Sequence, residues 1–258
     1  MKIFFKNMMT LLACLMFLVC SGCGIKAESD KNKVAYSVTD VTGTVIEFSE
    51  KPKRIVSMGI GSDEILLELV EPERIAALTY LADDAGISSV SVKAQVIKGR
   101  VQRNNLEAIL SYAPDLVVVP DWDGIDFVGQ LRSAGIKVYV HKTPNTMQEI
   151  KANIAELAAA VGEDEQGYLL QQQMDERLSA IWSKVGKIKP EQRKKIVALS
   201  FMGPMGIKGS SFDDMCHYAN IINAVENLDI PRNAAFSEEQ MLLLDPDIIL
   251  VPSWDYSG

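Results

Sequence analysis

One segment of this chain occurs twice, and the repetition constrains the fold more than any other feature. The segment Leu106–Asp123, LEAILSYAPDLVVVPDWD, returns 132 positions later as EEQMLLLDPDIILVPSWD. Glu107 then corresponds to Glu239, and Trp122 to Trp254, without a gap. Two copies differ from the short-period array of a solenoid. They predict two similar lobes in one chain.

Each copy predicts a helix, a turn and a strand. The helix is indicated by an apolar stripe at helical spacing, Leu106, Ile109 and Leu110 in the first copy. The Pro-Asp turn ends it, because proline disfavours helical geometry in the residue before it. The aliphatic runs Leu116–Val119 and Ile248–Val251 follow. Such runs are typical of parallel strands buried on both faces.

A tryptophan follows each predicted strand, Trp122 in the first copy and Trp254 in the second. In open parallel α/β sheets, ligands bind outside the carboxyl ends of the strands. The pair therefore favours aromatic walls of a small-molecule cleft, since aromatic side chains commonly line such sites. The alternative is that each ring covers the core of its own lobe.

The remaining pattern alternates strands and helices, which predicts a parallel α/β sheet in each lobe. A β-hairpin is expected first, with strands at Tyr36–Val41 and Val45–Phe48. Further predicted strands are Arg54–Met58, Arg74–Leu78, Val138–Val140 and Lys195–Phe201. Predicted helices include one capped by Ser62, one from Thr146 to Val161 and one from Asp164 to Val185. The last would span ~33 Å and could join the lobes as a single strut.

Other side chains near predicted strand ends are candidate ligand contacts. They are Met58, Tyr80, Arg100, Gln102, Met202, Met205 and Tyr256. Arginine and glutamine could orient carboxylate, phosphate or hydroxamate groups. Methionine suits a plastic apolar wall, but plain core packing explains these methionines equally well. The glycine-rich loop around Lys208 could offer free backbone N–H groups to an anion.

Composition and motifs argue against several classes of protein. The net charge of −8, without a basic patch, argues against a nucleic-acid partner. Only two histidines are present, and no His-carboxylate spacing predicts a metal site. We expect no cofactor and no catalytic residue. Gly59 and Gly61 resemble part of a dinucleotide fingerprint, but its third glycine is absent. Cys216 is the one cysteine that follows the N-terminal segment, and it is expected to be buried as a small hydrophobic residue.

The N-terminus has the pattern of a secretion signal. Lys2 and Lys6 precede an apolar run from Met8 to Val19, too short for a spanning helix. Small residues then lead to Cys23, as in bacterial lipoproteins, although Cys20 occupies the position that is usually leucine. We expect acylation of Cys23 and anchoring at a membrane face; simple secretory cleavage is the alternative.

The predicted organisation has five parts. Residues 1–23 form the lipoprotein signal and 24–35 a polar tether; 36–145 form the first α/β lobe. Residues 146–190 hold two helices, including the interlobe helix at about 164–185, and 191–258 form the second lobe. In the first lobe a helix and a strand, Gly124 to Val140, follow the repeat. No such pattern follows the second copy, so we expect the second lobe to be C-terminally incomplete.

Taken in order, these segments resemble the substrate-binding proteins of ABC importers for iron–siderophore complexes, haem and cobalamin. The most specific is NNLEAILSYAPDLVVVP, and the likeness covers about residues 36 to 258. It implies two Rossmann-like lobes joined by one long helix, with ligand held between them. It also implies docking on the permease, which works with an ATPase, through one glutamate per lobe, Glu107 and Glu239. A helix-dipole role explains the same glutamates.

Three functions remain open at this stage. The first is a non-enzymatic lipid-anchored receptor, on the outer face of the cytoplasmic membrane, that delivers an iron complex or a corrinoid to a permease. The second is a secreted nucleotide-binding enzyme that uses the glycine-rich loop. The third is a sensor or adhesion lipoprotein that kept the fold and lost transport.

Overall fold

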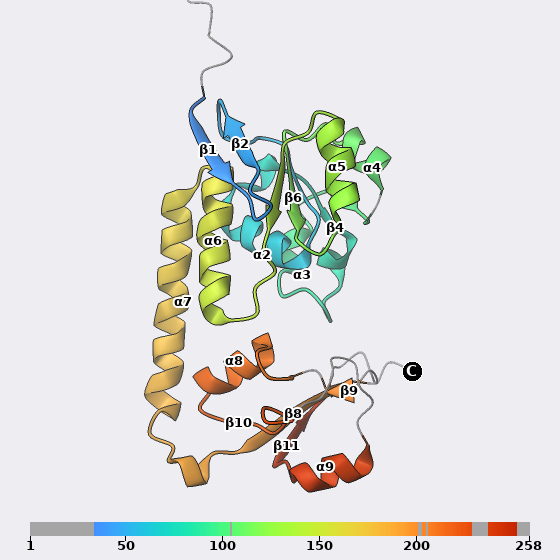
Figure 1. The fold of residues 1–258 in the computed structure, drawn as a ribbon. Helices are drawn as coiled ribbons and strands as arrows, with labels where there is room; N and C mark the ends of the chain where they lie inside the picture. The colour runs from blue at the N-terminus through green and yellow to red at the C-terminus, as the bar shows by residue number, and fades with distance from the viewer. Residues whose placement is uncertain (1–33, 104, 201–202, 205, 229–236, 252–258) are drawn as a thin grey trace, which may run out of the picture. The chain divides into compact units, whose positions relative to one another are not determined.

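The fold is that of a computed structural model of the 258-residue chain, described for residues 34–103, 105–200, 203–204, 206–228 and 237–251 (Figure 1). The chain divides into two units, residues 1–34 and 35–258, and all elements described here belong to the second. Among the described helices, none combines the length and apolar character that crossing a bilayer requires.

A small hairpin opens the described chain. Strands β1 (Tyr36–Thr39) and β2 (Val45–Phe48) pair antiparallel, as predicted. The Asp40 carboxylate accepts the backbone N–H groups of Thr42 and Thr44 at 2.9 and 3.0 Å. Gly43 has a φ of +80°, which glycine adopts without strain. The turn is therefore held by local polar bonds, while Phe48 packs into the core.

Five parallel strands form the main sheet. They are β3 (Ile55–Ser57), β4 (Ile75–Thr79), β5 (Gly99–Val101), β6 (Leu116–Pro120) and β7 (Val138–His141). Their order is β5-β4-β3-β6-β7, so the chain adds strands to one side of β3 and then to the other. This is the strand order of a Rossmann-like half, as predicted. The sequence pattern did not predict β5.

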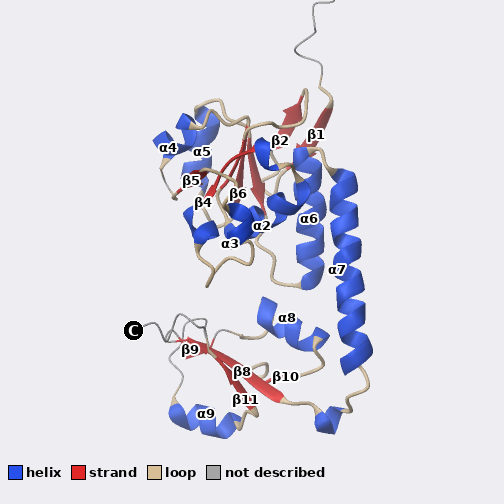
Figure 2. Ribbon diagram, turned by 180° about the vertical axis from the view of Figure 1, so that it is seen from behind, coloured by secondary structure: helices blue, strands red, loops and turns tan. Residues whose placement is uncertain are grey.

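Helices cover both faces of this sheet (Figures 1 and 2). Helices α2 (Ile60–Leu69) and α6 (Met147–Val161) pack on one face, against Leu116 and Val118. Helices α4 (Leu106–Ser111) and α5 (Ile125–Ser133) share a second core with Val117 and Val119. Successive β6 side chains thus point to opposite cores, which explains its uninterrupted apolar sequence.

One local expectation in this lobe is wrong. Helix α2 begins at Ile60 with Gly59 as its N-cap, so Ser62 does not cap it. The Ser62 hydroxyl instead donates to the Gly59 carbonyl at 2.8 Å, inside the first turn. Short turns of helix flank β4: η1 (Pro72–Arg74) precedes it, and η2 (Tyr80–Asp83) and α3 (Ser91–Ala94) lie between β4 and β5.

Helix α7 (Asp164–Val185) follows α6 and has the predicted bounds, 22 residues long. It packs closely on α6, because a Cβ at Gly167 would lie 2.4 Å from the Cβ of Ala158. Lys151 of α6 pairs with Asp175 of α7 at 2.7 Å. Gly167 is the one fully buried residue of α7, so most of this helix is accessible to solvent.

A second, smaller sheet follows η3 (Pro190–Gln192). Its elements are β8 (Lys195–Ser200), β9 (Gly203–Pro204), α8 (Ser211–Tyr218), β10 (Ile222–Asn223), α9 (Glu238–Leu244) and β11 (Ile248–Leu250). The order β10-β8-β11 is parallel, and β9 pairs antiparallel with β8. It matches the β4-β3-β6 centre of the first sheet. Cys216 is buried here as predicted, and burial raises the pKa of its thiol to about 11.

The predicted burial of the two repeat strands is right for β6 and wrong for β11. Every β6 residue is buried, whereas Ile248, Ile249 and Leu250 are 43%, 51% and 46% exposed. Strand β6 pairs with β3 and β7, and β11 pairs within the described residues with β8 alone. The apolar stripe of α4 is also narrower than predicted, since Leu110 is 40% exposed.

Candidate functional site

The candidate site lies at the carboxyl edge of the five-stranded sheet. Because all five strands are parallel, the residues after β3, β4, β5, β6 and β7 lie along one edge. Tyr80, Gln102 and Trp122 are exposed there, at 51% for Tyr80 and 50% for Trp122. Three of the ligand contacts that the sequence suggested are therefore accessible and lie at the same edge of the sheet.

Arg103 and Asp123 form a charged pair around Trp122. The Arg103 Nε donates to Asp123 Oδ1 at 2.7 Å, and the guanidinium carbon lies 4.5 Å from the centre of the Trp122 ring. The Asp123 side chain is fully buried, while the Arg103 side chain is 54% exposed. A buried carboxylate thus holds a cation against an accessible aromatic face. This arrangement offers a stacking surface and remaining N–H donors to one bound molecule.

Arg100 is bonded inside the protein rather than presented at the edge. Its Nε donates to Asp83 Oδ2 at 2.8 Å, and its other nitrogens donate to the carbonyls of Ala94, Ile97 and Gly99. The hydrogen bonds from Arg100 hold the pKa of the Asp83 carboxyl below its usual range. These contacts tie β5 to the loop that precedes it. The geometry favours Arg103 over Arg100 as the arginine available to a ligand.

Met58 packs in the core and is 2% exposed, together with Val56 and Ile109. The sequence left core and cleft roles open for this methionine, and the structure places it in the core. Met202, Met205, Trp254 and Tyr256 lie outside the described residues, and so does the predicted acylation site Cys23. Their predicted roles remain predictions.

Asp63 lies buried beneath the edge, in the first turn of α2. Its Oδ2 accepts the backbone N–H and the hydroxyl of Thr79, at 3.1 and 2.6 Å. Its Oδ1 has no hydrogen-bond partner among the described residues. Burial raises its pKa to about 7, although the hydrogen bonds oppose this rise. An acidic group here makes the start of α2 a poor phosphate site, which weakens the nucleotide-binding interpretation of Gly59 and Gly61.

His141 closes β7 and is also buried, at 4% exposure. Its Nδ1 lies 3.3 Å from Asn153 Nδ2 and 3.1 Å from the Lys142 carbonyl. Burial lowers the pKa of this imidazole. No cluster of three or more metal-ligating side chains occurs in the part of the chain that the structure describes.

The glycine-rich loop after β9 is bonded to its own lobe. Asn223 Nδ2 donates to the Gly206 carbonyl at 2.6 Å, and Gly209 N–H donates to Asp213 Oδ2 at 2.8 Å. The backbone N–H of Gly209 is therefore not free for an anion. Lys208 itself is exposed.

The two paired glutamates occupy matching positions. Glu107 is the second residue of α4, and Glu239 is the second residue of α9; both are exposed. Each helix is capped by the preceding side chain: Asn105 accepts the Ala108 N–H at 3.0 Å, and Ser237 accepts the Gln240 N–H at 3.1 Å. Each carboxylate is thus presented from the first turn of a capped helix that leads into a Pro-Asp turn.

Sequence reasoning missed Arg103 and Asp123. Asp123 is part of the repeated Trp-Asp pair, and this repetition was an available signal for it. Arg103 carries no such signal, because the corresponding position in the second copy, Ala235, is not basic. Its role follows only from the tertiary structure, in which Arg103, in the segment between β5 and α4, reaches Asp123 after β6.

Comparison with known proteins identifies a family whose model matches most of the chain. Residues 55–257 match the family model described as "Periplasmic binding protein". A cobalamin-binding protein of Halobacterium salinarum is 21% identical over 229 residues, which cover 87% of this chain and 60% of that protein. The chain thus spans less than two thirds of that relative. An uncharacterized ABC transporter substrate-binding lipoprotein of Bacillus subtilis, YvrC, is 24% identical over 248 residues, covering 89% of this chain and 75% of the relative.

Solved structures agree on the fold. The haem-binding protein HmuT aligns with a TM-score of 0.67 at 20% identity, covering 87% of this chain and 74% of its own. The periplasmic vitamin B12 binding protein BtuF of Vibrio cholerae aligns with a TM-score of 0.62 at 19% identity, covering 80% of this chain and 79% of its own. At these identities the likeness establishes the fold of this chain.

Proposed function

This chain belongs to the periplasmic binding protein family, and we propose that it is an extracytoplasmic substrate-binding lipoprotein of an ABC importer. It captures an iron complex, haem or a corrinoid and delivers it to a permease without chemical change. The predicted acylation of Cys23 holds it at the outer face of the cytoplasmic membrane. Relatives named for cobalamin and haem binding support this ligand class.

The observation that carries the proposal is the matched presentation of Glu107 and Glu239. Both are second residues of capped helices, both are exposed, and both precede the same Pro-Asp turn. A receptor that docks on a permease needs accessible charges held in defined geometry, because rim charges steer and orient association. Two equivalent carboxylates, one on α4 and one on α9, meet this need.

Charge reversal tests the docking role. The double variant Glu107→Arg, Glu239→Arg should lower ligand uptake by cells more than tenfold, because each change replaces an attraction with a repulsion. Ligand affinity of the purified protein should stay the same. Asp126→Arg is the matched control, since Asp126 is also an exposed acid in the first turn of a helix, α5. Full uptake by the double variant would exclude this docking surface.

Trp122 and Arg103 are the proposed ligand contacts of the first lobe. The accessible indole ring contacts a flat part of the ligand, and the guanidinium that lies over this ring binds an anionic group. Asp123 positions the guanidinium by its bond to Nε. Tyr80 and Gln102 extend this surface along the strand ends. Trp254, Tyr256, Met202 and Met205 are the proposed contacts of the second lobe.

A titration of the signal-free protein identifies the ligand. Trp fluorescence is followed while ferric hydroxamates, ferric catecholates, haem, cobalamin and cobinamide are added one at a time. We expect saturable quenching by one of these classes. Arg103→Gln should weaken that binding about tenfold or more, as for the loss of a charged hydrogen bond. Arg100→Gln is the control and should leave the affinity of the folded protein unchanged. A larger effect at Arg100 would overturn the assignment to Arg103.

A further inference from the structure

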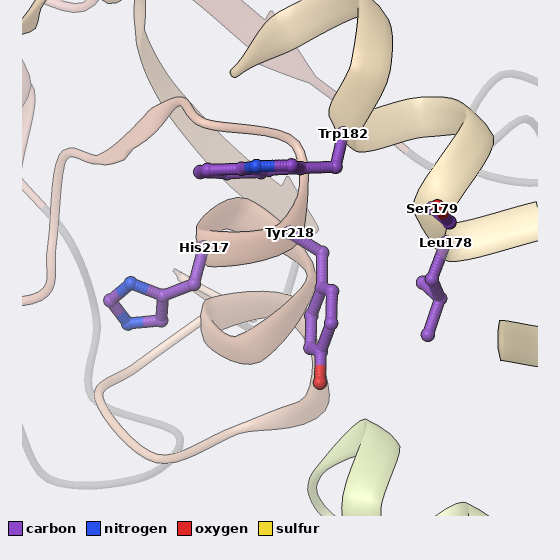
Figure 3. A pocket seen from close by; sticks show the side chains of 5 residues that line it. All are labelled: Leu178, Ser179, Trp182, His217 and Tyr218. Atoms are coloured by element: carbon purple, nitrogen blue, oxygen red, sulfur yellow. The ribbon is translucent and has the colours of Figure 1, made fainter.

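A separate apolar pocket lies away from the sheet edge, between α7 and α8. It has a volume of about 400 Å³ and is lined by Leu178, Ser179 and Trp182 of α7 and by His217 and Tyr218 of α8. Figure 3 shows the indole of Trp182 extending from α7 over α8, with the rings of His217 and Tyr218 beneath it. None of these residues belongs to the proposed ligand surface.

The aromatic side chains of this pocket are unusually accessible for large apolar groups. Trp182 is 52% exposed and Tyr218 is 37% exposed. Exposing this much aromatic surface forgoes the free energy that its burial would contribute. Two of the lining residues, Tyr218 and Ser179, also carry a hydroxyl group. The pocket therefore combines accessible aromatic side chains with hydroxyl groups.

The walls of the pocket are fixed before any ligand arrives. Asn220, just after α8, donates from Nδ2 to the carbonyls of Val185 and Ile188 at 2.7 and 3.1 Å. At the middle of α8, Asp214 Oδ2 accepts the N–H of Met147 at 2.6 Å. These bonds hold α8 against the end of α7 and the start of α6. A preformed site binds with a smaller loss of conformational entropy.

The lining also limits the ligand's chemistry. None of the five lining side chains is an acid, a lysine or an arginine. A charged ligand would lose hydration there without gaining an opposite charge. Indole, phenol and imidazole rings favour a flat π system. The volume lies within the range of small-molecule pockets, and it is too small for a folded partner.

We propose that the pocket between α7 and α8 binds a small, neutral, planar aromatic molecule with a hydrogen-bond acceptor at its edge. The ring system packs against Trp182 and Leu178, and the Tyr218 hydroxyl donates to the acceptor. This site is independent of the ligand surface around Trp122.

A single-tryptophan protein tests this site with quinoline as the probe. Quinoline is neutral at pH 8, planar and carries one acceptor nitrogen. In the variant Trp122→Phe, Trp254→Phe, only Trp182 reports by fluorescence. We expect saturable quenching by quinoline, and about tenfold weaker binding of naphthalene, which has the same shape and no acceptor.

Variants in this background decide the assignment. Tyr218→Phe should weaken quinoline binding about tenfold and leave naphthalene binding unchanged, since it removes only the hydroxyl. Leu178→Arg should abolish binding of both probes, because it replaces an apolar wall of the pocket with a long charged side chain and adds no second tryptophan. Ile181→Ala is the control, because Ile181 is 43% exposed on α7 and does not line the pocket.

Linear, unsaturable quenching, or equal affinities in Tyr218→Phe and the parent, would overturn the proposal. The importer ligand is titrated against Tyr218→Phe in the otherwise unchanged protein, where its affinity should stay the same. Failure of the pocket is thereby distinguished from failure of the proposed transport function.

Discussion

The two copies of the repeat share their local geometry. Ala113 and Asp245, each before the proline of its copy, both have a φ of +45°, in the left-handed region. Asp115 and Asp247 each accept a backbone N–H from the start of the neighbouring strand, β3 or β8, at 2.9 and 2.8 Å. The same short sequence thus produces the same capped helix, turn and strand twice, because caps and turns depend on neighbouring residues.

The copies differ in what surrounds them. Strand β6 lies between two strands under helices on both faces, whereas β11 is about half exposed and pairs, in the described chain, with β8 (Figure 1). An identical local pattern therefore does not fix burial. Burial depends on elements that are distant in sequence, and this is why the prediction for β6 holds while the one for β11 fails.

A buried aspartate gives a second contrast between the lobes. Asp63, in the first helix after β3, bonds to Thr79 at the end of β4; Asp213, in the first helix after β8, bonds to Asn223 at the end of β10. Both oxygens of Asp213 accept hydrogen bonds, whereas Asp63 Oδ1 has no partner among the described residues. The buried aspartate therefore has all its acceptor atoms paired in the second lobe, whereas in the first lobe one carboxylate oxygen has no described partner.

The largest expected difference in stability comes from truncating equivalent residues of the two repeat strands. Leu116 and Ile248 are equivalent positions of the repeat, fully buried in β6 and 43% exposed in β11. Leu116→Ala should lower the free energy of unfolding by about 2–5 kcal/mol, because it leaves a cavity. Ile248→Ala should cost less than about 1 kcal/mol. Urea denaturation followed by circular dichroism measures both, and equal losses would show that β11 is as buried as β6 in solution.

Asparagine substitutions should act in opposite directions at the paired aspartates. Asp63 has a pKa of about 7 in the fold, against an ordinary value of 3.8. The folded protein therefore binds the proton more tightly, and stability is lost as pH rises from about 3.8 through 7. Asp63→Asn removes this loss, worth on the order of 4 kcal/mol. The stability of this variant, relative to that of the parent protein, should therefore increase between pH 4 and pH 8.

Asp213→Asn should instead destabilise the protein at pH 8, by about 1–3 kcal/mol. One of its two acceptor oxygens becomes an NH₂ group that faces a donor, either Gly209 N–H or Asn223 Nδ2. Urea midpoints across the pH range compare the two variants. A pH-independent difference between Asp63→Asn and the parent would mean that Asp63 stays ionised in the fold.

Sequence patterns predicted what is local or periodic. The bounds of α7 follow from acids at its start, lysines near its end and a 3.6-residue apolar stripe. The repeat alone paired Glu107 with Glu239 and placed Trp122 at a strand end. Strand β5 was missed because Gly99–Val101 is too short to show a pattern, and it exists through pairing with β4.

The candidate site shows the same division. Trp122 was predictable, since it directly follows a strongly apolar strand. Arg103 was not, because its partner Asp123 lies 20 residues away and the pair forms only after β5 and β6 take their places in the sheet. Arg100 looked equally suitable in sequence, and its partner Asp83 is likewise set by tertiary structure. Charged ligand contacts in this chain depend on such distant pairs.

The two helix caps provide a smaller test in which the copies should respond alike. Asn105→Ala and Ser237→Ala each remove the side-chain acceptor for a first-turn N–H, at a cost of about 0.5–2 kcal/mol. Asn105→Gly and Ser237→Gly should cost only a few tenths, because the glycine backbone is easily hydrated. Hydrogen exchange of α4 and α9 measures each helix separately. A response in one helix alone would contradict the local equivalence of the copies.

The smallest expected effect concerns Asp247, whose local partners differ from those of Asp115. Lys194 Nζ donates to Asp247 Oδ1 at 2.7 Å, in addition to the backbone N–H of Lys195, and these bonds lower the pKa of this carboxyl below 3.8. The described partners of Asp115 are backbone N–H groups. The contribution of Asp247 to stability is therefore present above pH 3.8 and is lost as pH falls through its lower folded value.

Lys194→Gln should shift the Asp247 titration midpoint upward towards 3.8, as followed by carboxyl-carbon NMR. Asp247 is exposed, so salt screens its ion pair with Lys194 and the effect on the free energy of unfolding is small. The titration is therefore the sharper readout. An unchanged Asp247 midpoint would assign its lowered pKa to the backbone bond. That bond belongs to the repeated turn itself, and both copies would then hold their aspartates by the same means.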